Sequence, residues 1–195
     1  MRIGILGGSF NPIHNGHLAI ARGMIERKVV DEVALMVSPR NPIKPANSLL
    51  PENVRLHLAQ IACQEEKNIF ASDYEFHLKR PSYTWNTLCS LRKSFPEKNF
   101  ILLIGADNWK IFRQWHKSQD IINNFEIAIY PRIGFDISPS LLPPKVKFID
   151  LPLHNISSTE IRDRISHGSD VSCFLPHAVY REIMGRHLFQ DTNAH

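Results

Sequence analysis

The sequence has little cysteine, no long apolar run and no cluster of basic residues. Its three cysteines, Cys63, Cys89 and Cys173, lie far apart, which argues against a disulfide framework or a cysteine-based zinc site and fits a reducing cytoplasm. No stretch is apolar over the length of a membrane span. The chain starts with a strand pattern instead of a charged leader and an apolar core, so we expect a soluble, unprocessed protein.

Charge and composition narrow the classes of function further. The 23 lysines and arginines exceed the 19 acidic residues, but they are spread along the chain. This balance suits anionic substrates and does not indicate nucleic-acid binding. Apart from His14 and His17 the ten histidines are scattered, and no nearby carboxylate completes a ligand set, which argues against a protein-bound metal and a metal-dependent hydrolase.

Length and pattern predict the fold class. A chain of 195 residues with 43% hydrophobic content is expected to form one domain, residues 1–195. Strand patterns occupy residues 3–6, 32–37, 69–78, 100–104, 125–130 and 146–151. The third alternates, with Asp73, Glu75 and His77 on an exposed face, as at a sheet edge. Apolar patterns do not separate an interface from a core, so an oligomer is as compatible with them as a monomer.

Helical patterns lie between these strands. They follow His17, begin at Pro51, run from Ser82 or Thr84 towards Phe95, pass through residues 111–122, run from Ser157 or Ser158 to Gly168, and begin again at Pro176. The alternation predicts an α/β protein with a doubly wound, mostly parallel sheet and helices on both faces. Ligands of such sheets bind at the carboxyl ends of the strands.

The corner after the first strand has the composition of a phosphate site. Residues 7–17 read Gly-Gly-Ser-Phe-Asn-Pro-Ile-His-Asn-Gly-His. The first N–H groups of a helix lack partners within the helix, and the helix dipole adds positive charge, so an anion is favoured there. Gly7 and Gly8 leave room for a phosphate, and Gly16 keeps the first turn open between His14 and His17, which project from about the same side as donors. Each feature alone is ordinary, but together after a strand they indicate function.

This stretch is similar to the signature of the nucleotidylyltransferase superfamily, which ends in His-x-Gly-His. Many members have aspartate where this chain has Asn11. Residues 156–162, Ile-Ser-Ser-Thr-Glu-Ile-Arg, are similar to the second motif of that superfamily, Ser-Ser-Thr-x-x-Arg. The resemblance implies a Rossmann-like nucleotide-binding topology whose winding reverses between the first strand and the strand that ends at Ile104.

The middle of the chain resembles the bacterial nicotinate mononucleotide adenylyltransferases. The similar segments are residues 80–88, which contain Ser-Tyr-Thr, then Ile104-Gly105-Ala106-Asp107, and Trp115. The resemblance implies transfer of AMP from ATP, with Mg²⁺, to nicotinate mononucleotide in NAD biosynthesis. Alternatives are adenylylation of nicotinamide mononucleotide or of phosphopantetheine. A nucleotide-binding regulator without turnover is a further alternative, and it predicts loss of a motif histidine or of Arg162, which are present.

Matching positions imply roles for individual residues. His14 and His17 would be catalytic and hold the ATP phosphates. The implied ATP-binding residues are Gly7, Gly8, Ser9, Phe10, His14, Gly16, His17, Gly105, Asp107, Ser157, Ser158, Thr159 and Arg162. The implied acceptor-binding residues are Lys44, Tyr83, Thr84, Asp107, Trp115 and Arg132. Ordinary alternatives are a solvated loop lysine for Lys44, helix caps for Ser157 and Ser158, and core aromatics for Tyr83 and Trp115.

Overall fold

The strands form one parallel sheet in the part of the chain that the structure describes. The computed structural model describes residues 1–39 and 49–190. Its strands are β1 (Arg2–Gly8), β2 (Glu32–Val37), β3 (Ile69–Ser72), β4 (Asn99–Gly105), β5 (Glu126–Tyr130) and β6 (Val146–Phe148). Their order is β3-β2-β1-β4-β5-β6, and every pairing is parallel. This is the order of doubly wound, Rossmann-like sheets, so the predicted fold class is confirmed.

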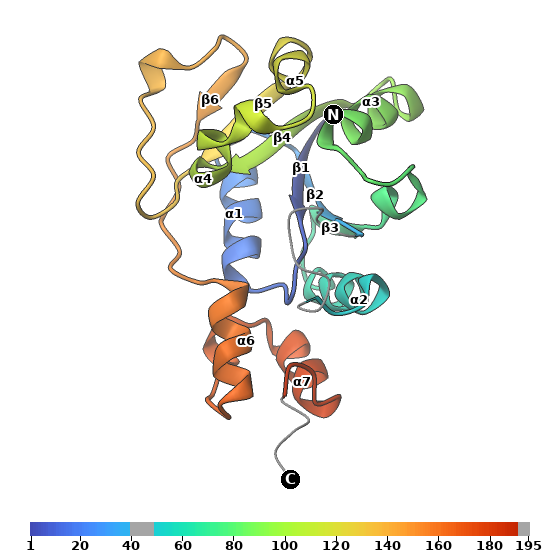
Figure 1. Cartoon of the computed structure of the whole chain (residues 1–195), viewed down its shortest axis with the longest axis vertical. Coiled ribbons are helices and arrows are strands. Elements are labelled where there is room, and N and C mark those ends of the chain that lie inside the picture. The colour runs from blue at the N-terminus through green and yellow to red at the C-terminus, as the bar shows by residue number, and fades with distance from the viewer. Residues whose placement is uncertain (40–48, 191–195) are drawn as a thin grey trace.

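Helices cover both faces of this sheet (Figure 1). They are α1 (Asn15–Glu26), α2 (Glu52–Ala62), α3 (Thr84–Ser94), α4 (Ala106–Lys110), α5 (Ser118–Asn124), α6 (Ser158–Ser166) and α7 (His177–Gly185), with 3-10 turns η2 (Tyr74–His77), η3 (Phe112–Gln114), η4 (Pro139–Leu141) and η5 (Ser172–Phe174). Helices α1, α2, α6 and α7 share one hydrophobic core, and α3, α5 and η3 share the other. No described helix combines the length and apolarity that crossing a bilayer requires.

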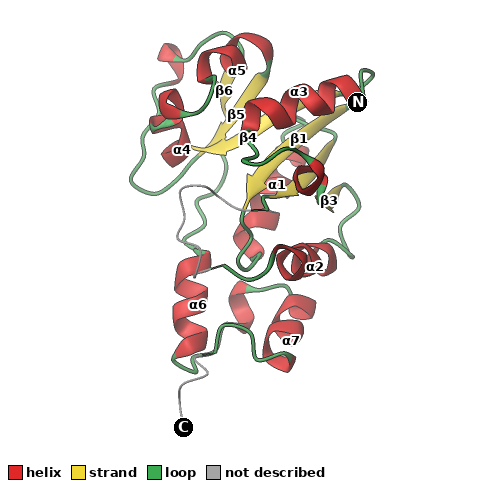
Figure 2. Ribbon diagram, turned by 45° about the vertical axis from the view of Figure 1, so that its right-hand side comes forward, coloured by secondary structure: helices red, strands yellow, loops and turns green. Residues whose placement is uncertain are grey.

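Alternate side chains of the strands supply the two cores. Ile3 and Ile5 of β1 belong to the core under α3 and α5, whereas Leu6 belongs to the core under α1 and α2. A strand buried on both faces has to be apolar throughout. Continuous apolar runs therefore predicted β1, β2 and β4 correctly. Figure 2 shows the strands as one twisted sheet between helices, and because β1 lies beside β4, the winding reverses where predicted.

The third strand is shorter than predicted. It lies at the sheet edge as expected, but it ends at Ser72, and residues 74–77 form the turn η2. Glu75, expected on an exposed face, is only 7% exposed. Its carboxylate accepts hydrogen bonds from the hydroxyls of Ser82 and Thr87. The alternating pattern was misleading because a polar side chain is buried and paired there.

Helix α3 begins without the predicted serine or threonine cap. Tyr83 occupies the N-cap position and its own side chain makes no capping hydrogen bond, while the Ser82 hydroxyl donates to Glu75. At α6 the prediction is confirmed, since the Ser157 hydroxyl accepts from the backbone N–H of Glu160 at 3.1 Å. A cap therefore forms where no nearer polar partner competes for the hydroxyl.

Two further boundaries differ from the sequence prediction. The helix expected over residues 111–122 is broken into α4, η3 and α5, because Trp115 is extended and Lys117 adopts the left-handed conformation with φ of 53°. Strand β6 ends at Phe148 rather than at residue 151. Because of this break, Trp115 and His116 lie in a short connection between η3 and α5.

A buried arginine ties the carboxyl ends of β1 and β2 to the start of α2. Arg55 is 1% exposed. Its guanidinium donates hydrogen bonds to the carbonyl oxygens of Ser9 at 2.6 Å, Ser38 at 2.9 Å, Pro39 at 2.8 Å and Leu50 at 3.0 Å. Burial lowers the pKa of this guanidinium, and the nearby charge of Glu52 opposes that effect. Irregular backbone at these strand ends has no ladder partner, so a side chain with several donors satisfies it.

Removing this guanidinium should destabilise the whole protein. For Arg55→Met we expect the free energy of unfolding, measured by urea denaturation, to fall by at least about 3 kcal/mol, because buried carbonyl groups lose their donors. The matched control is Arg181→Met on the exposed side of α7, which should change stability by less than about 0.5 kcal/mol. A loss below about 1 kcal/mol in Arg55→Met would show that water replaces the guanidinium without cost.

Candidate active site

The loop between β1 and α1 presents two stacked imidazoles. Helix α1 begins at Asn15, so His14 is its N-cap and His17 lies one turn later. The ring centroids of His14 and His17 are 3.7 Å apart, with an angle of 26° between the planes. The backbone N–H of His14 donates to Nδ1 of His17 at 3.3 Å. When the His17 ring carries one proton, this bond to Nδ1 places that proton on Nε2, so Nε2 can act as a donor.

His14 lies deeper than its partner and is electrically neutral. Its side chain is 3% exposed. Burial of the ring lowers the pKa of His14 to about 3, and the positive charge of Arg132 contributes to this shift to a smaller extent. Its buried Nδ1 has no hydrogen bond of normal geometry with a described residue. His14 therefore contributes a polar ring at neutral pH, not a positive charge.

The glycines of this loop have different roles. A Cβ on Gly16 would lie 3.0 Å from Nδ1 of His14, so glycine makes room for that ring. A Cβ on Gly8 would lie 3.1 Å from the ring of Phe10, which in turn packs edge-on against His17 with centroids 4.9 Å apart. A Cβ on Gly7 would meet nothing within 4 Å. The space beside Gly8 is thus filled by Phe10, and the space beside Gly7 is open.

The second motif docks on the backbone of the first. The Ser158 hydroxyl donates to the carbonyl oxygen of Pro12 at 2.9 Å, and the Arg162 guanidinium donates to that of Asn11 at 2.8 Å. Arg162 also lies 3.4 Å from the hydroxyl oxygen of Thr159. These side chains lie at the start of α6, which sits below α1 in Figure 1. The structure therefore brings together two motifs that are about 150 residues apart, with the start of α6 in contact with the loop that precedes α1.

A charged pair stands at the end of β4 and β5. Asp107 lies in the first turn of α4, and Arg132 follows β5. Nε of Arg132 is 3.8 Å from Oδ1 of Asp107, and neither atom has a hydrogen bond with a described residue. Gly105 lacks the Cβ that would collide with the Asp107 carboxylate and approach Arg132 to 3.1 Å. Arg132 also lies near enough to His14 for its positive charge to lower the pKa of that histidine.

The predicted aromatic residues lie at the start of α3 and between η3 and α5. Tyr83 is 39% exposed and stacks on His116, with ring centroids 4.5 Å apart. Trp115, the neighbour of His116, packs on Phe112 at 5.0 Å and is partly buried in a core. The structure thus pairs Tyr83 with His116 rather than with Trp115. Sequence reasoning missed His116, although its place beside Trp115 was a signal.

Of the predicted acceptor-binding residues, Lys44 lies outside the described residues. Within residues 1–39 and 49–190, no group of three histidine, cysteine, aspartate or glutamate side chains is arranged to hold a metal ion. All three cysteines are free.

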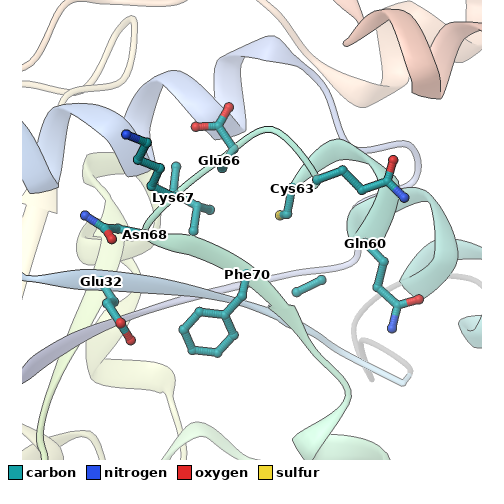
Figure 3. Close-up of a pocket in the computed structure, with 10 residues that line it drawn as sticks. Glu32, Gln60, Cys63, Glu66, Lys67, Asn68 and Phe70 are labelled. Carbon is teal, nitrogen blue, oxygen red and sulfur yellow. The ribbon is translucent and has the colours of Figure 1, made fainter.

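Two open hollows of the structure lie away from the histidines. One, of about 370 Å³, lies at the amino ends of β2 and β3, among Gln60, Cys63 and Phe70 (Figure 3). A larger one, of about 1160 Å³, lies between residues 136–145 and the helices α4 and α5. Neither is lined by His14 or Arg162. The candidate site lies at the carboxyl edge of the sheet, where doubly wound sheets bind their ligands.

Known proteins resemble this chain over most of its length. The family model described as "Cytidylyltransferase-like" matches residues 5–164. A protein of Bacteroides fragilis (strain YCH46) named "Probable nicotinate-nucleotide adenylyltransferase" is 46% identical over 183 residues, which are 94% of this chain and 91% of that protein. A protein of Bacteroides thetaiotaomicron with the same name is 44% identical over the same shares of the two chains.

Solved structures share the fold. "Plasmodium falciparum nicotinic acid mononucleotide adenylyltransferase complexed with NaAD" matches with a TM-score of 0.83 and 22% identity, over 96% of this chain and 97% of that one. The likeness at this identity concerns the fold, whereas the family follows from the closer relatives. The chain therefore belongs to the cytidylyltransferase-like family and, within it, to the family of the nicotinate-nucleotide adenylyltransferases.

Proposed function

We propose that this chain transfers AMP from ATP to nicotinate mononucleotide, which gives nicotinate adenine dinucleotide and pyrophosphate. The observation that carries the proposal is the contact of α6 with the loop of His14 and His17, made by Ser158 and Arg162. This contact gathers donors for a polyphosphate at the carboxyl edge of the sheet. The names of relatives up to 46% identical support nicotinate mononucleotide as the acceptor.

The reaction needs orientation more than a strong base. The acceptor phosphate is ionised near neutral pH, so its oxygen attacks the α-phosphorus of ATP while the bond to the pyrophosphate oxygen breaks. Catalysis then consists of alignment and of stabilising the charge that builds on the α-phosphate and the leaving group. Nε2–H of His17 is a suitable donor to the α-phosphate, and the neutral His14 supports its ring by stacking.

The phosphates of ATP can be assigned to residues of the two motifs. Ser158, Thr159 and Arg162 would hold the β and γ phosphates, and Arg162 can do so bidentately because its guanidinium has further donors. Mg²⁺ would arrive with ATP, held by phosphates and water, because the described residues offer no carboxylate cluster for it. Three free cysteines suit a reducing cytoplasm as the place of this reaction.

The acceptor would bind towards β4 and α3. Asp107 is available for a ribose hydroxyl of ATP or of the acceptor, and Arg132, with Lys44, for the acceptor phosphate. Tyr83, Thr84 and Trp115 would bind the pyridine ring of the acceptor, with the two aromatic rings as candidates for a wall beside it. The side chain of the N-cap residue Tyr83 makes no capping hydrogen bond, so the backbone N–H groups of the first turn of α3 can donate to a carboxylate.

The choice of acceptor is the first test. We expect kcat/KM for pyrophosphate release from ATP to be at least roughly tenfold higher with nicotinate mononucleotide than with nicotinamide mononucleotide. The backbone N–H groups at the start of α3 can donate to a carboxylate, whereas the NH₂ of the amide is itself a donor and would face them without an acceptor. Phosphopantetheine should support no more than background release. Equal use of the acid and the amide, or turnover of phosphopantetheine alone, would overturn the proposed acceptor.

The second test concerns the histidine donor. In His17→Ala, kcat should fall roughly 100-fold or more, since a preorganised group that stabilises transition-state charge is lost. The KM for ATP should change much less. A matched control is His167→Ala, an exposed histidine at the end of α6, which should keep wild-type kcat. Near-normal turnover in His17→Ala would remove His17 from the catalytic machinery.

A further inference from the structure

The start of α3 is held in place by a buried carboxylate. Glu75 of η2 accepts a hydrogen bond from the Thr87 hydroxyl at 2.8 Å on one oxygen and from the Ser82 hydroxyl at 3.3 Å on the other. Ser82 and Thr87 flank Tyr83 and Thr84 in the sequence. The two bonds therefore fix the backbone on both sides of the residues that would meet the acceptor.

The same carboxylate reaches the carboxyl end of β2. The Ser38 side chain also lies close to Glu75, where it opposes the rise in the pKa of the carboxyl that burial causes. The backbone N–H of Ser38 donates to the carbonyl oxygen of Gly8 at 2.9 Å, which ties it to the end of β1. Burial raises the pKa of Glu75, and the bonds from Thr87, Ser38 and Ser82 oppose that shift. Glu75 thus links the strand ends of the ATP side to the first turn of α3.

The Thr87 hydroxyl has a second acceptor within reach. It lies 3.4 Å from the carbonyl oxygen of Tyr83, farther than from Glu75. Without the carboxylate, this hydroxyl can turn fully to the Tyr83 carbonyl, and Ser82 loses its partner. Tyr83 can then shift, because the residue is 39% exposed and its stacking on His116 holds the ring but not the backbone.

We propose that Glu75 is a positioning residue that sets the acceptor end of the site, by holding Ser82 and Thr87 on either side of Tyr83 and Thr84. The inference rests on the proposed function, because it takes residues 83 and 84 as acceptor-binding. Glu75 does not touch either substrate in this scheme. Its loss should weaken acceptor binding and leave the ATP phosphates, held by α1 and α6, nearly undisturbed.

Steady-state kinetics separate positioning from general destabilisation. In Glu75→Leu the KM for the acceptor should rise at least roughly tenfold, as expected when buried hydrogen bonds to a carboxylate are lost, while the KM for ATP stays within about twofold of wild type. Glu75→Gln should recover most of this loss, because its amide still offers an acceptor and the hydroxyls can turn to accept from its NH₂. Asp73→Asn, an exposed carboxylate of the same turn, should match wild type.

Thr87→Val provides the same test with a smaller change. It removes one hydroxyl, and the acceptor KM should rise roughly threefold with the ATP KM unchanged. This variant keeps the inference testable if Glu75→Leu does not fold. An acceptor KM within about twofold of wild type in Glu75→Leu or, if that variant is unfolded, in Thr87→Val would overturn the inference, and so would an equal rise in the KM for ATP.

The wild-type enzyme separates this inference from the proposed function. It is first assayed with nicotinate mononucleotide, nicotinamide mononucleotide and phosphopantetheine, and the variants are then read with whichever acceptor it uses. If the enzyme uses none of these acceptors, the proposed function is wrong. The positioning role of Glu75 is then tested by amide hydrogen exchange. Residues 83–87 should then exchange faster in Thr87→Val, and in Glu75→Leu if it folds, than in wild type while residues 8–17 do not, and unchanged exchange at 83–87 would refute the positioning role.

Discussion

The burial of one guanidinium holds the candidate site together. Arg55 donates to carbonyl groups that follow two neighbouring strands of the sheet. They are those of Ser9 after β1 and of Ser38 and Pro39 after β2. These carbonyls have no place in the sheet ladder, and unpaired they would be costly. Carbonyl dipoles satisfy the arginine without adding a negative charge to the edge at which we propose that phosphates bind. With this loop fixed, α6 can dock on the backbone of Asn11 and Pro12.

The parts of the fold that depend on burial were predictable from the sequence. The strand pattern over residues 32–37 has the same bounds as β2, because a strand buried on both faces carries an uninterrupted apolar run. The two motifs predicted the family, which the matching relatives confirm. That the motifs meet in space followed only from the resemblance, since residues 158 and 12 have no local signal that joins them. The roles given to the motif residues stay predictions.

Polar groups that pair across the fold were not predictable in the same way. Glu75 looked exposed because alternation reports a half-buried strand, whereas its burial depends on hydroxyls that lie seven and twelve residues further along the chain. For the same reason the predicted cap of α3 is absent: the Ser82 hydroxyl pairs with Glu75, and Tyr83 is the N-cap residue. Arg55 did leave a signal, since it shares a helix face with Leu58, Ala59 and Ala62, and a charged residue on such a face needs buried partners.

A crystal structure of the protein with a non-hydrolysable ATP analogue and nicotinate mononucleotide would show where the two substrates bind. We expect the β and γ phosphates at Ser158, Thr159 and Arg162, the α-phosphate within hydrogen-bonding distance of Nε2 of His17, and the pyridine ring beside Tyr83. The mononucleotide phosphate should face the α-phosphorus in line with the leaving oxygen. A triphosphate bound away from residues 8–17 and 157–162 would contradict the assignment of this edge of the sheet as the active site.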